Sequence, residues 1–299
     1  MLLVGQSLLL WRGRLARALA AAEAAPLLDR AARQVEAGAA ALDLNAGTEG
    51  TTATLVATVR ALRPAHPGLP LWLDAAAAGV LATTLDACAA AGLRGPFVAN
   101  AAGAGGTPDA GSTRLLEACA RHRAGVVVSP RAVDAGSRPA TAEAVAAAAL
   151  EGLETARAIG LTGPVYLDAL AWPAASDPPR AERSLAVLRR LRDVPGAVPL
   201  VAVGNVAHGL GWPLTVAMRG LYAAAATAAG AGALIMPVEE TATVRAVQLA
   251  CGEAFPADVA ESYLATFGEA IRAGEHPHPP PRIAGETLRE AWRLLFDAD

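Results

Sequence analysis

Short acidic and amide side chains stand at the ends of several apolar, strand-like segments of this sequence. They are Asp43, Asn45, Asp74, Asn100, Asp168 and Asn205. A carboxylate only accepts hydrogen bonds, whereas a carboxamide both donates and accepts them. A convergent set of such groups in an apolar pocket can orient a flat, nitrogen-rich ligand. One Asp after a strand is often only a helix cap, so the interpretation depends on the set being brought together.

The sequence also excludes several kinds of chemistry. All 25 basic residues are arginine, which excludes Schiff-base lysine catalysis and a Walker-type phosphate lysine. Cys88, Cys119 and Cys251 are few, odd in number and far apart, so they form neither a disulfide framework nor a metal cluster. We find no Ser/His/Asp or Cys/His arrangement and expect no metal site.

Composition and charge indicate a globular chain of 299 residues, of which 54% are apolar, with a net charge of −3 and no block of like charge. We therefore expect no nucleic-acid partner. A membrane span would need about 20 uninterrupted apolar residues, and none occur. The apolar start, Met1–Leu10, lacks a basic region and is interpreted as a first strand rather than a signal peptide. We expect a cytoplasmic protein.

The elements that must position the polar residues alternate between strand and helix. The predicted strands are Leu2–Val4, Ala41–Leu44, Leu71–Leu73, Phe97–Ala99, Val126–Val128, Val165–Leu167, Leu200–Val203 and Leu234–Met236. The predicted helices are Leu27–Glu36, Thr52–Leu62, Val80–Ala91, Thr113–Arg123, Thr141–Ile159, Arg180–Arg192, Thr215–Ala229 and Ala242–Cys251. This alternation predicts an α/β fold, a (β/α)8 TIM barrel, whose active site lies where the strands end. No Gly-x-Gly-x-x-Gly turn follows the first strand, which counts against a dinucleotide-binding sheet.

The end of the chain differs in pattern from the barrel. We predict a barrel domain over residues 1–254 and a C-terminal helical extension with a Pro-rich linker over 255–299. Within the extension, Pro256–Ala273 and Glu286–Phe296 are amphipathic and predicted helical. The proline-rich stretch His276–Pro281 separates them, and we interpret it as a stiff linker rather than a metal site.

Five strand-end motifs, in order, resemble those of methyltetrahydrofolate:corrinoid/iron–sulfur protein methyltransferases, which are pterin-binding barrels similar to dihydropteroate synthase. The resemblance extends from Met1 to about Cys251. Its motifs are Ala-Leu-Asp-Leu-Asn-Ala-Gly (41–47), Leu-Trp-Leu-Asp (71–74), Phe-Val-Ala-Asn (97–100), Tyr-Leu-Asp-Ala-Leu-Ala-Trp-Pro (166–173) and Val-Gly-Asn-Val (203–206).

The resemblance implies a role for each motif residue. Asp74, Asn100 and Asp168 would hold the pterin, and Asn205 would approach N5, the nitrogen that carries the methyl group. Two sets of residues would complete the site: Asp43 and Asn45 at the rim, and Gly204 and His208 beside Asn205. The implied substrate is methyltetrahydrofolate, and the implied methyl acceptor or donor is the cobalt of a corrinoid carried by a partner protein. The resemblance also implies a homodimer.

The sequence departs from the family pattern at four positions. Gln6 and Leu9 stand where the family has Glu and Asn after the first strand, Gly204 where it has Ser, and His208 where it has Gln. An imidazole next to Asn205 can relay a proton, although a loop histidine is more often a solvated or capping residue.

Three alternatives remain beside methyl transfer. A non-catalytic pterin- or folate-binding subunit is favoured by the missing Glu and Asn. A dihydropteroate synthase-like enzyme is disfavoured, because that family has a lysine near the pterin and a Gly-Gly-Ser-Thr-type signature that this chain lacks. A different barrel lyase or hydrolase acting on a small anionic substrate would bind no folate.

Overall fold

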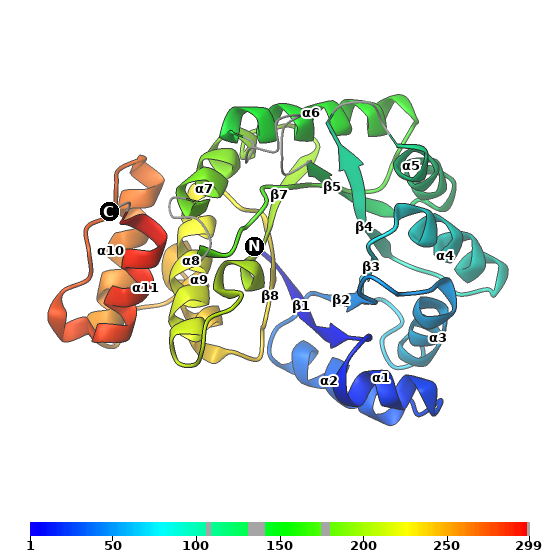
Figure 1. The fold of residues 1–299 in the computed structure, drawn as a ribbon, viewed down its shortest axis with the longest axis horizontal. Helices are drawn as coiled ribbons and strands as arrows, with labels where there is room; N and C mark the ends of the chain where they lie inside the picture. Colours follow the sequence, from blue (N-terminus) through cyan, green and yellow to red (C-terminus); the bar gives the residue numbers. More distant parts are fainter. Residues whose placement is uncertain (106–108, 131–140, 175–179, 298–299) are drawn as a thin grey trace.

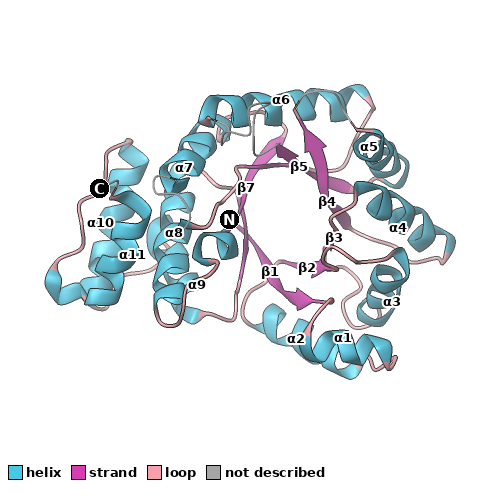
Figure 2. Cartoon of the chain, in the orientation of Figure 1, coloured by secondary structure: helices cyan, strands magenta, loops and turns pink. Residues whose placement is uncertain are grey.

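The computed structural model describes residues 1–105, 109–130, 141–174 and 180–297. Eight parallel strands close into a barrel in the order in which they occur in the sequence. Helices surround this barrel on the outside (Figures 1 and 2). The strands are β1 (Leu2–Leu9), β2 (Ala41–Asn45), β3 (Leu71–Asp74), β4 (Phe97–Ala104), β5 (Gly125–Pro130), β6 (Val165–Asp168), β7 (Ala197–Ala202) and β8 (Ala233–Met236). The predicted (β/α)8 barrel is confirmed.

Each strand is followed by at least one helix that packs on the outside of the barrel. These helices are α1 (Gly13–Ala20), α2 (Ala25–Glu36), α3 (Thr52–Leu62), α4 (Ala78–Ala90), α5 (Ala110–His122), α6 (Ala142–Ala158), α7 (Arg180–Leu191), α8 (Leu214–Ala229) and α9 (Thr241–Cys251). A short 3-10 helix, η2 (Val203–Ala207), precedes α8. The C-terminal extension contains α10 (Val259–Ala273), η3 (Arg282–Ala284) and α11 (Glu286–Phe296).

The interior of the barrel is a packed apolar layer. Side chains alternate across each strand, so every second residue points inwards. The inward set includes Val4, Trp72, Val98, Val127 and Tyr166, all at most 8% exposed. The rings of Trp72 and Tyr166 lie 4.6 Å apart between centroids. This layer forms an apolar floor beneath the polar residues that follow on the same strands.

A second core lies between the barrel and its helices, formed by the outward residues of the strands. Leu42, Leu44, Leu71 and Leu73 are fully buried in it. Helix α8 is buried on two sides, because it contacts the neighbouring barrel helices as well as α10 and α11. Its small residues Ala223–Ala226 are fully buried, and small side chains allow this close packing. Figure 1 shows α10 and α11 outside α8 and α9.

Several predicted bounds are wrong, among them the following. The first strand continues to Leu9 and is followed by α1, for which no helix was predicted. The seventh strand ends at Ala202, because Val203 already belongs to η2. The first helix of the extension begins at Val259, where Asp258 caps it, rather than at Pro256. Each error concerns the end of an element, where local pattern is weakest.

No helix among the described residues is both long and apolar enough to cross a membrane.

Candidate functional site

One cavity of about 520 Å³ opens where the barrel strands end. Its floor contains Leu200, Ala202 and Ile235, which belong to β7 and β8. All eight of the site residues named from the sequence line this cavity: Asp43, Asn45, Asp74, Asn100, Asp168, Gly204, Asn205 and His208. The barrel brings them together because parallel strands end at the same rim and the alternation of side chains turns the same positions inwards.

Two neighbouring Asp–Asn pairs lie on β2, β3 and β4: Asp74 with Asn45, and Asp43 with Asn100. The Asn45 amide donates to Asp74 Oδ2 at 2.5 Å, and the Asn100 amide lies 3.5 Å from Asp43 Oδ1. Register explains the proximity, because Asn45 pairs with Asp74 and Asp74 pairs with Asn100 across the sheet. The site therefore has two carboxyl groups that are each oriented by a neighbouring amide.

Burial changes the ionisation of these two carboxyl groups. Asp43 is 3% exposed, and burial together with the charge of Asp74 raises its pKa well above the usual range. Burial also raises the pKa of Asp74 to about 7, although the hydrogen bond from Asn45 opposes this rise. Two neighbouring carboxyl groups in an apolar site resist double ionisation. The pair is therefore more readily protonated than an ordinary carboxyl group, and its protonated member can donate a hydrogen bond.

Asp168 lies on β6, which pairs with β5 and β7. Its Oδ1 accepts from the Leu170 backbone N–H at 2.9 Å, and its Oδ2 accepts from the Ser129 hydroxyl at 3.1 Å. Burial raises the pKa of Asp168, whereas these two hydrogen bonds lower it. The two contacts fix the plane of the carboxyl group, so Asp168 is a rigid hydrogen-bonding partner.

Asn205 and His208 lie at the open side of the cavity. Both are exposed, and η2 carries Asn205 immediately after β7. Gly204 faces the side chain of Gln6, and a Cβ at position 204 would lie 2.7 Å from both Gln6 Oε1 and Nε2. Two of the departures from the family pattern are thus in contact. The absence of a side chain at 204 makes room for the Gln6 amide.

The structure adds residues to the cavity that the sequence analysis did not select. Trp11 and Arg12 line it, and both follow β1. Trp11 Nε1 donates to Asn45 Oδ1 at 3.1 Å, and the same oxygen accepts from the Gly47 backbone N–H. Asn45 therefore links Trp11 to Asp74. The glycine at position 47 is the one sequence feature that fits this contact. A Cβ there would lie 2.7 Å from the Trp11 ring, so a larger residue would displace Trp11.

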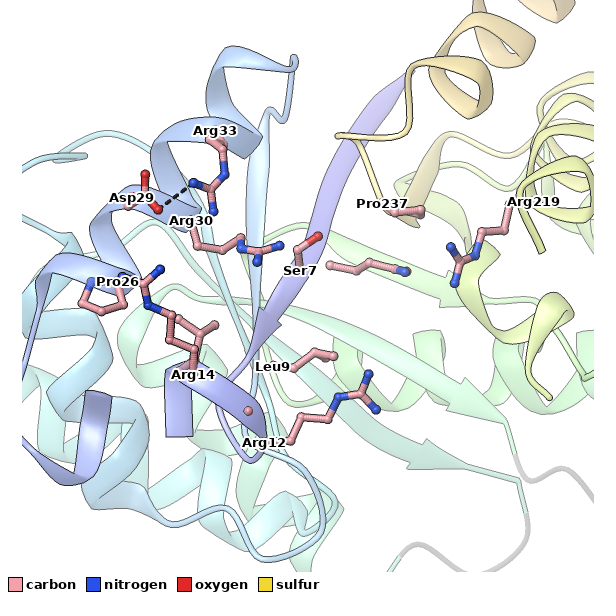
Figure 3. Close-up of a pocket in the computed structure, with 13 residues that line it drawn as sticks. Ser7, Leu9, Arg12, Arg14, Pro26, Asp29, Arg30, Arg33, Arg219 and Pro237 are labelled. Atoms are coloured by element: carbon pink, nitrogen blue, oxygen red, sulfur yellow. Dashed lines mark hydrogen bonds and ion pairs between the residues drawn. The ribbon is translucent and has the colours of Figure 1, made fainter. Parts of the chain in front are cut away.

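Two smaller cavities adjoin the central one. A cavity of about 300 Å³ shares Asp168, Asn205 and His208 with it and includes Trp172 and Pro173. On the opposite side, a cavity of about 390 Å³ shares Gln6, Leu9 and Arg12 and contains several more arginines (Figure 3). The central cavity thus has an edge with both apolar and polar residues beside β6, and a positively charged edge beside β1.

This arrangement is suited to binding a polar heterocycle. The described lining of the central cavity contains three carboxyl groups, several amides and an apolar floor, but no cysteine, serine or lysine that would serve as a nucleophile. Among the described residues, no group of His, Cys, Asp and Glu side chains is arranged to hold a metal ion. Orientation through hydrogen bonds, rather than covalent catalysis, is the chemistry that these side chains offer.

Comparisons with known proteins bear on the fold. No protein-family model and no curated protein matches the sequence. Solved dihydropteroate synthases do match the structure. The enzyme of Xanthomonas albilineans, solved with 4-aminobenzoic acid, has a TM-score of 0.58 at 20% identity, covering 85% of this chain and 93% of that one.

Two further dihydropteroate synthases give similar values. The enzyme of Thermus thermophilus has a TM-score of 0.54 at 23% identity, covering 83% of this chain and 92% of that one. The enzyme of Yersinia pestis, solved with a pterine–sulfa conjugate, has a TM-score of 0.56 at 18% identity, covering 85% and 94%. The chain therefore has the fold of the dihydropteroate synthases, an eight-stranded parallel barrel, here extended by two C-terminal helices.

Proposed function

We propose that this protein binds a reduced folate in the central cavity and transfers the N5-methyl group of methyltetrahydrofolate to, or from, the cobalt of a corrinoid protein. The observation that carries the proposal is the convergence of Asp74, Asn100, Asp168 and Asn205 on one cavity above an apolar floor. A pterin ring presents an amide, an amino group and ring nitrogens, which require carboxylate and carboxamide partners at fixed angles.

The donor and acceptor pattern suits such a ring. In the proposed complex, the free oxygen of Asp74 and the carboxyl group of Asp168 accept from the amino and N–H groups of the pterin. Asn100 both donates and accepts. Because both pKa values are raised, the protonated member of the Asp43–Asp74 pair would donate to a ring nitrogen.

Methyl transfer fits a cavity without a protein nucleophile. In this reaction the electron pair of Co(I) attacks the methyl carbon, the bond between that carbon and N5 breaks, and N5 keeps the pair and gains a proton. Asn205 would polarise N5, and the exposed His208 would bring the proton. The exposure of both side chains at the mouth is what approach by a second protein requires. The absence of lysine argues against a dihydropteroate synthase-like reaction.

The first test is a titration of the protein with methyltetrahydrofolate. We expect micromolar binding, and we expect the Asp168→Ala variant to lose it. Asp193→Ala is the matched control, because Asp193 is 86% exposed and lies outside the cavity. Absence of binding by the unaltered protein would remove the proposed function and leave the lyase or hydrolase alternative.

The second test assigns the role of Asn205. Removing a group that acts mainly in the transition state lowers kcat more than it weakens substrate binding. We expect Asn205→Ala to slow methyl transfer about 100-fold, while the Kd for methyltetrahydrofolate changes less than about threefold. Single-turnover kinetics with a corrinoid protein and a parallel titration measure the two effects. Equal losses in rate and affinity would contradict the role.

A non-catalytic folate-binding subunit is the second candidate. The observation that favours it is that Gln6 and Leu9 place an amide and an apolar side chain where the resembled family has a carboxylate and an amide. Tight folate binding without methyl transfer to any of several corrinoid proteins would support this candidate over the enzyme.

A further inference from the structure

The positively charged cavity beside β1 is the feature that the proposed chemistry does not use. Its lining includes five arginines, contributed by the loop after β1, α1, α2 and α8: Arg12, Arg14, Arg30, Arg33 and Arg219. Figure 3 shows Arg30 reaching towards Ser7 from α2, with Arg219 on the opposite side of the cavity. Such a concentration of guanidinium groups around a cavity is suited to carboxylate or phosphate ligands.

The neighbouring carboxylates neutralise only part of this charge. Glu239 accepts from Arg30 at 3.5 Å and from Arg33 at 3.3 Å, and Arg33 also pairs with Asp29 at 2.6 Å. Arg219 pairs with Glu240. Three carboxylates thus face five guanidinium groups.

Arg12 and Arg14 account for the excess of positive charge. Neither has an ion-pair partner among the described residues. Arg219, from α8, lines the same cavity, and among the described residues its buried Nε–H has no hydrogen-bond partner. Arg12 and Arg14, which are exposed, therefore offer unpaired donors to an anion.

This cavity lies directly beside the central one. Gln6, Leu9 and Arg12 line both of them. The Arg12 guanidinium lies 5.3 Å from the centre of the Trp11 ring, and Trp11 is held by Asn45, which also orients Asp74. The position of Arg12 is thus tied to the residues that would hold the ring of the ligand.

We propose that the arginine-lined cavity binds the carboxylates of the folate tail, with the aminobenzoyl ring crossing from the central cavity over Leu9. This inference rests on the proposed function for the identity of the ligand. Leu9 gives the apolar ring an apolar surface at the junction, and Arg12 and Arg14 supply the unpaired charge. One or more glutamates on the tail would each add an oxyanion to the site.

The inference can be tested without the pterin. The probes are p-aminobenzoyl-glutamate and p-aminobenzoyl-triglutamate, titrated at low and at high salt. We expect the triglutamate to bind at least about tenfold more tightly at low salt, because charged contacts near solvent are screened by ions. The double variant Arg12→Gln/Arg14→Gln is expected to remove this advantage. Each substitution should weaken the affinity for the triglutamate probe roughly threefold to fivefold.

Arg17→Gln is the matched control. Arg17 lies one turn beyond Arg14 on α1, is exposed and does not line the cavity, so its loss should leave the affinities unchanged. Equal binding of the two probes, or equal effects of the Arg17 and the Arg12/Arg14 substitutions, would overturn the inference. Binding of inorganic phosphate or pyrophosphate to the arginines without binding of either probe would also overturn it, since the anion would then be a free one.

A parallel titration with tetrahydropterin, which has no tail, separates this inference from the proposed function. Tetrahydropterin binding that depends on Asp168 supports the pterin site alone. Tail probes that bind through Arg12 and Arg14 support the anion site alone, whatever the result with tetrahydropterin.

Discussion

Asp43 and Asp74 are the residues in which the fold most strongly changes side-chain chemistry. Their pKa values rise because the barrel removes both from water and places them side by side. A carboxyl group whose pKa is higher in the folded than in the unfolded state stabilises the fold at low pH. That contribution is complete below the unfolded value of 3.8 and is lost as pH rises towards about 7.

Replacing Asp74 with Asn should remove this pH-dependent cost. The Asn side chain can still accept the hydrogen bond from Asn45. We expect Asp74→Asn to be more stable than the unaltered protein at pH 8 by about 1–2 kcal/mol, and to show little difference at pH 4. Urea unfolding at the two pH values measures this. Asp193→Asn, at an exposed position, is the control, and a difference that is independent of pH would contradict the assignment.

At the scale of an element, the bulge in β1 shapes the site. Gly5 pairs with Leu42 and Leu8 with Leu44, so Gln6 and Ser7 together oppose Asp43. The fully buried Gln34 of α2 accepts from the Ser7 backbone N–H at 2.9 Å. Bulges beside functional sites re-aim side chains. Here the bulge brings both Gln6 and Ser7 to the border of the arginine-lined cavity.

Gln34 should therefore support both stability and binding. Gln34→Leu leaves the Ser7 N–H without its partner, which costs about 1–3 kcal/mol. We also expect weaker methyltetrahydrofolate binding, because Gln6 would lose its fixed position. Thr84→Val is a suitable control, since Thr84 is equally buried but bonds only within its own helix. Equal losses in the free energy of unfolding, with unchanged affinity for methyltetrahydrofolate in both variants, would show that Gln34 does not position the bulge for binding.

At the scale of the whole molecule, the C-terminal extension is part of the packing of the barrel. Phe267 of α10 is 2% exposed and contacts Phe296 of α11, with ring centroids 5.5 Å apart. The linker between the helices is held in place, because His276 lies 3.0 Å from Glu182 of α7 and Tyr263 donates to the His278 carbonyl. We interpret the extension as a structural support for α8, while the predicted homodimer stays a prediction.

Phe267→Ala should consequently destabilise the entire protein. We expect the free energy of unfolding to fall by about 3–4 kcal/mol. The protein should still unfold in a single urea transition, at a lower urea concentration, because α8 packs both on α10 and on the barrel helices. Phe255→Ala should have no such effect, since Phe255 is 93% exposed. A separate early transition confined to the extension would show that it unfolds independently.

The sequence by itself determined the barrel and the polar rim. The alternation of strands and helices is a local pattern. Side chains alternate along a strand, so Asp43, Asp74, Asn100 and Asp168 point inwards like the apolar residues two positions before them. Only the tertiary structure decided the bulge held by Gln34, the link from Trp11 through Asn45 to Asp74, the raised pKa values and the arginine-lined cavity. These features depend on contacts between residues far apart in the chain, and such contacts exist only after the barrel has closed.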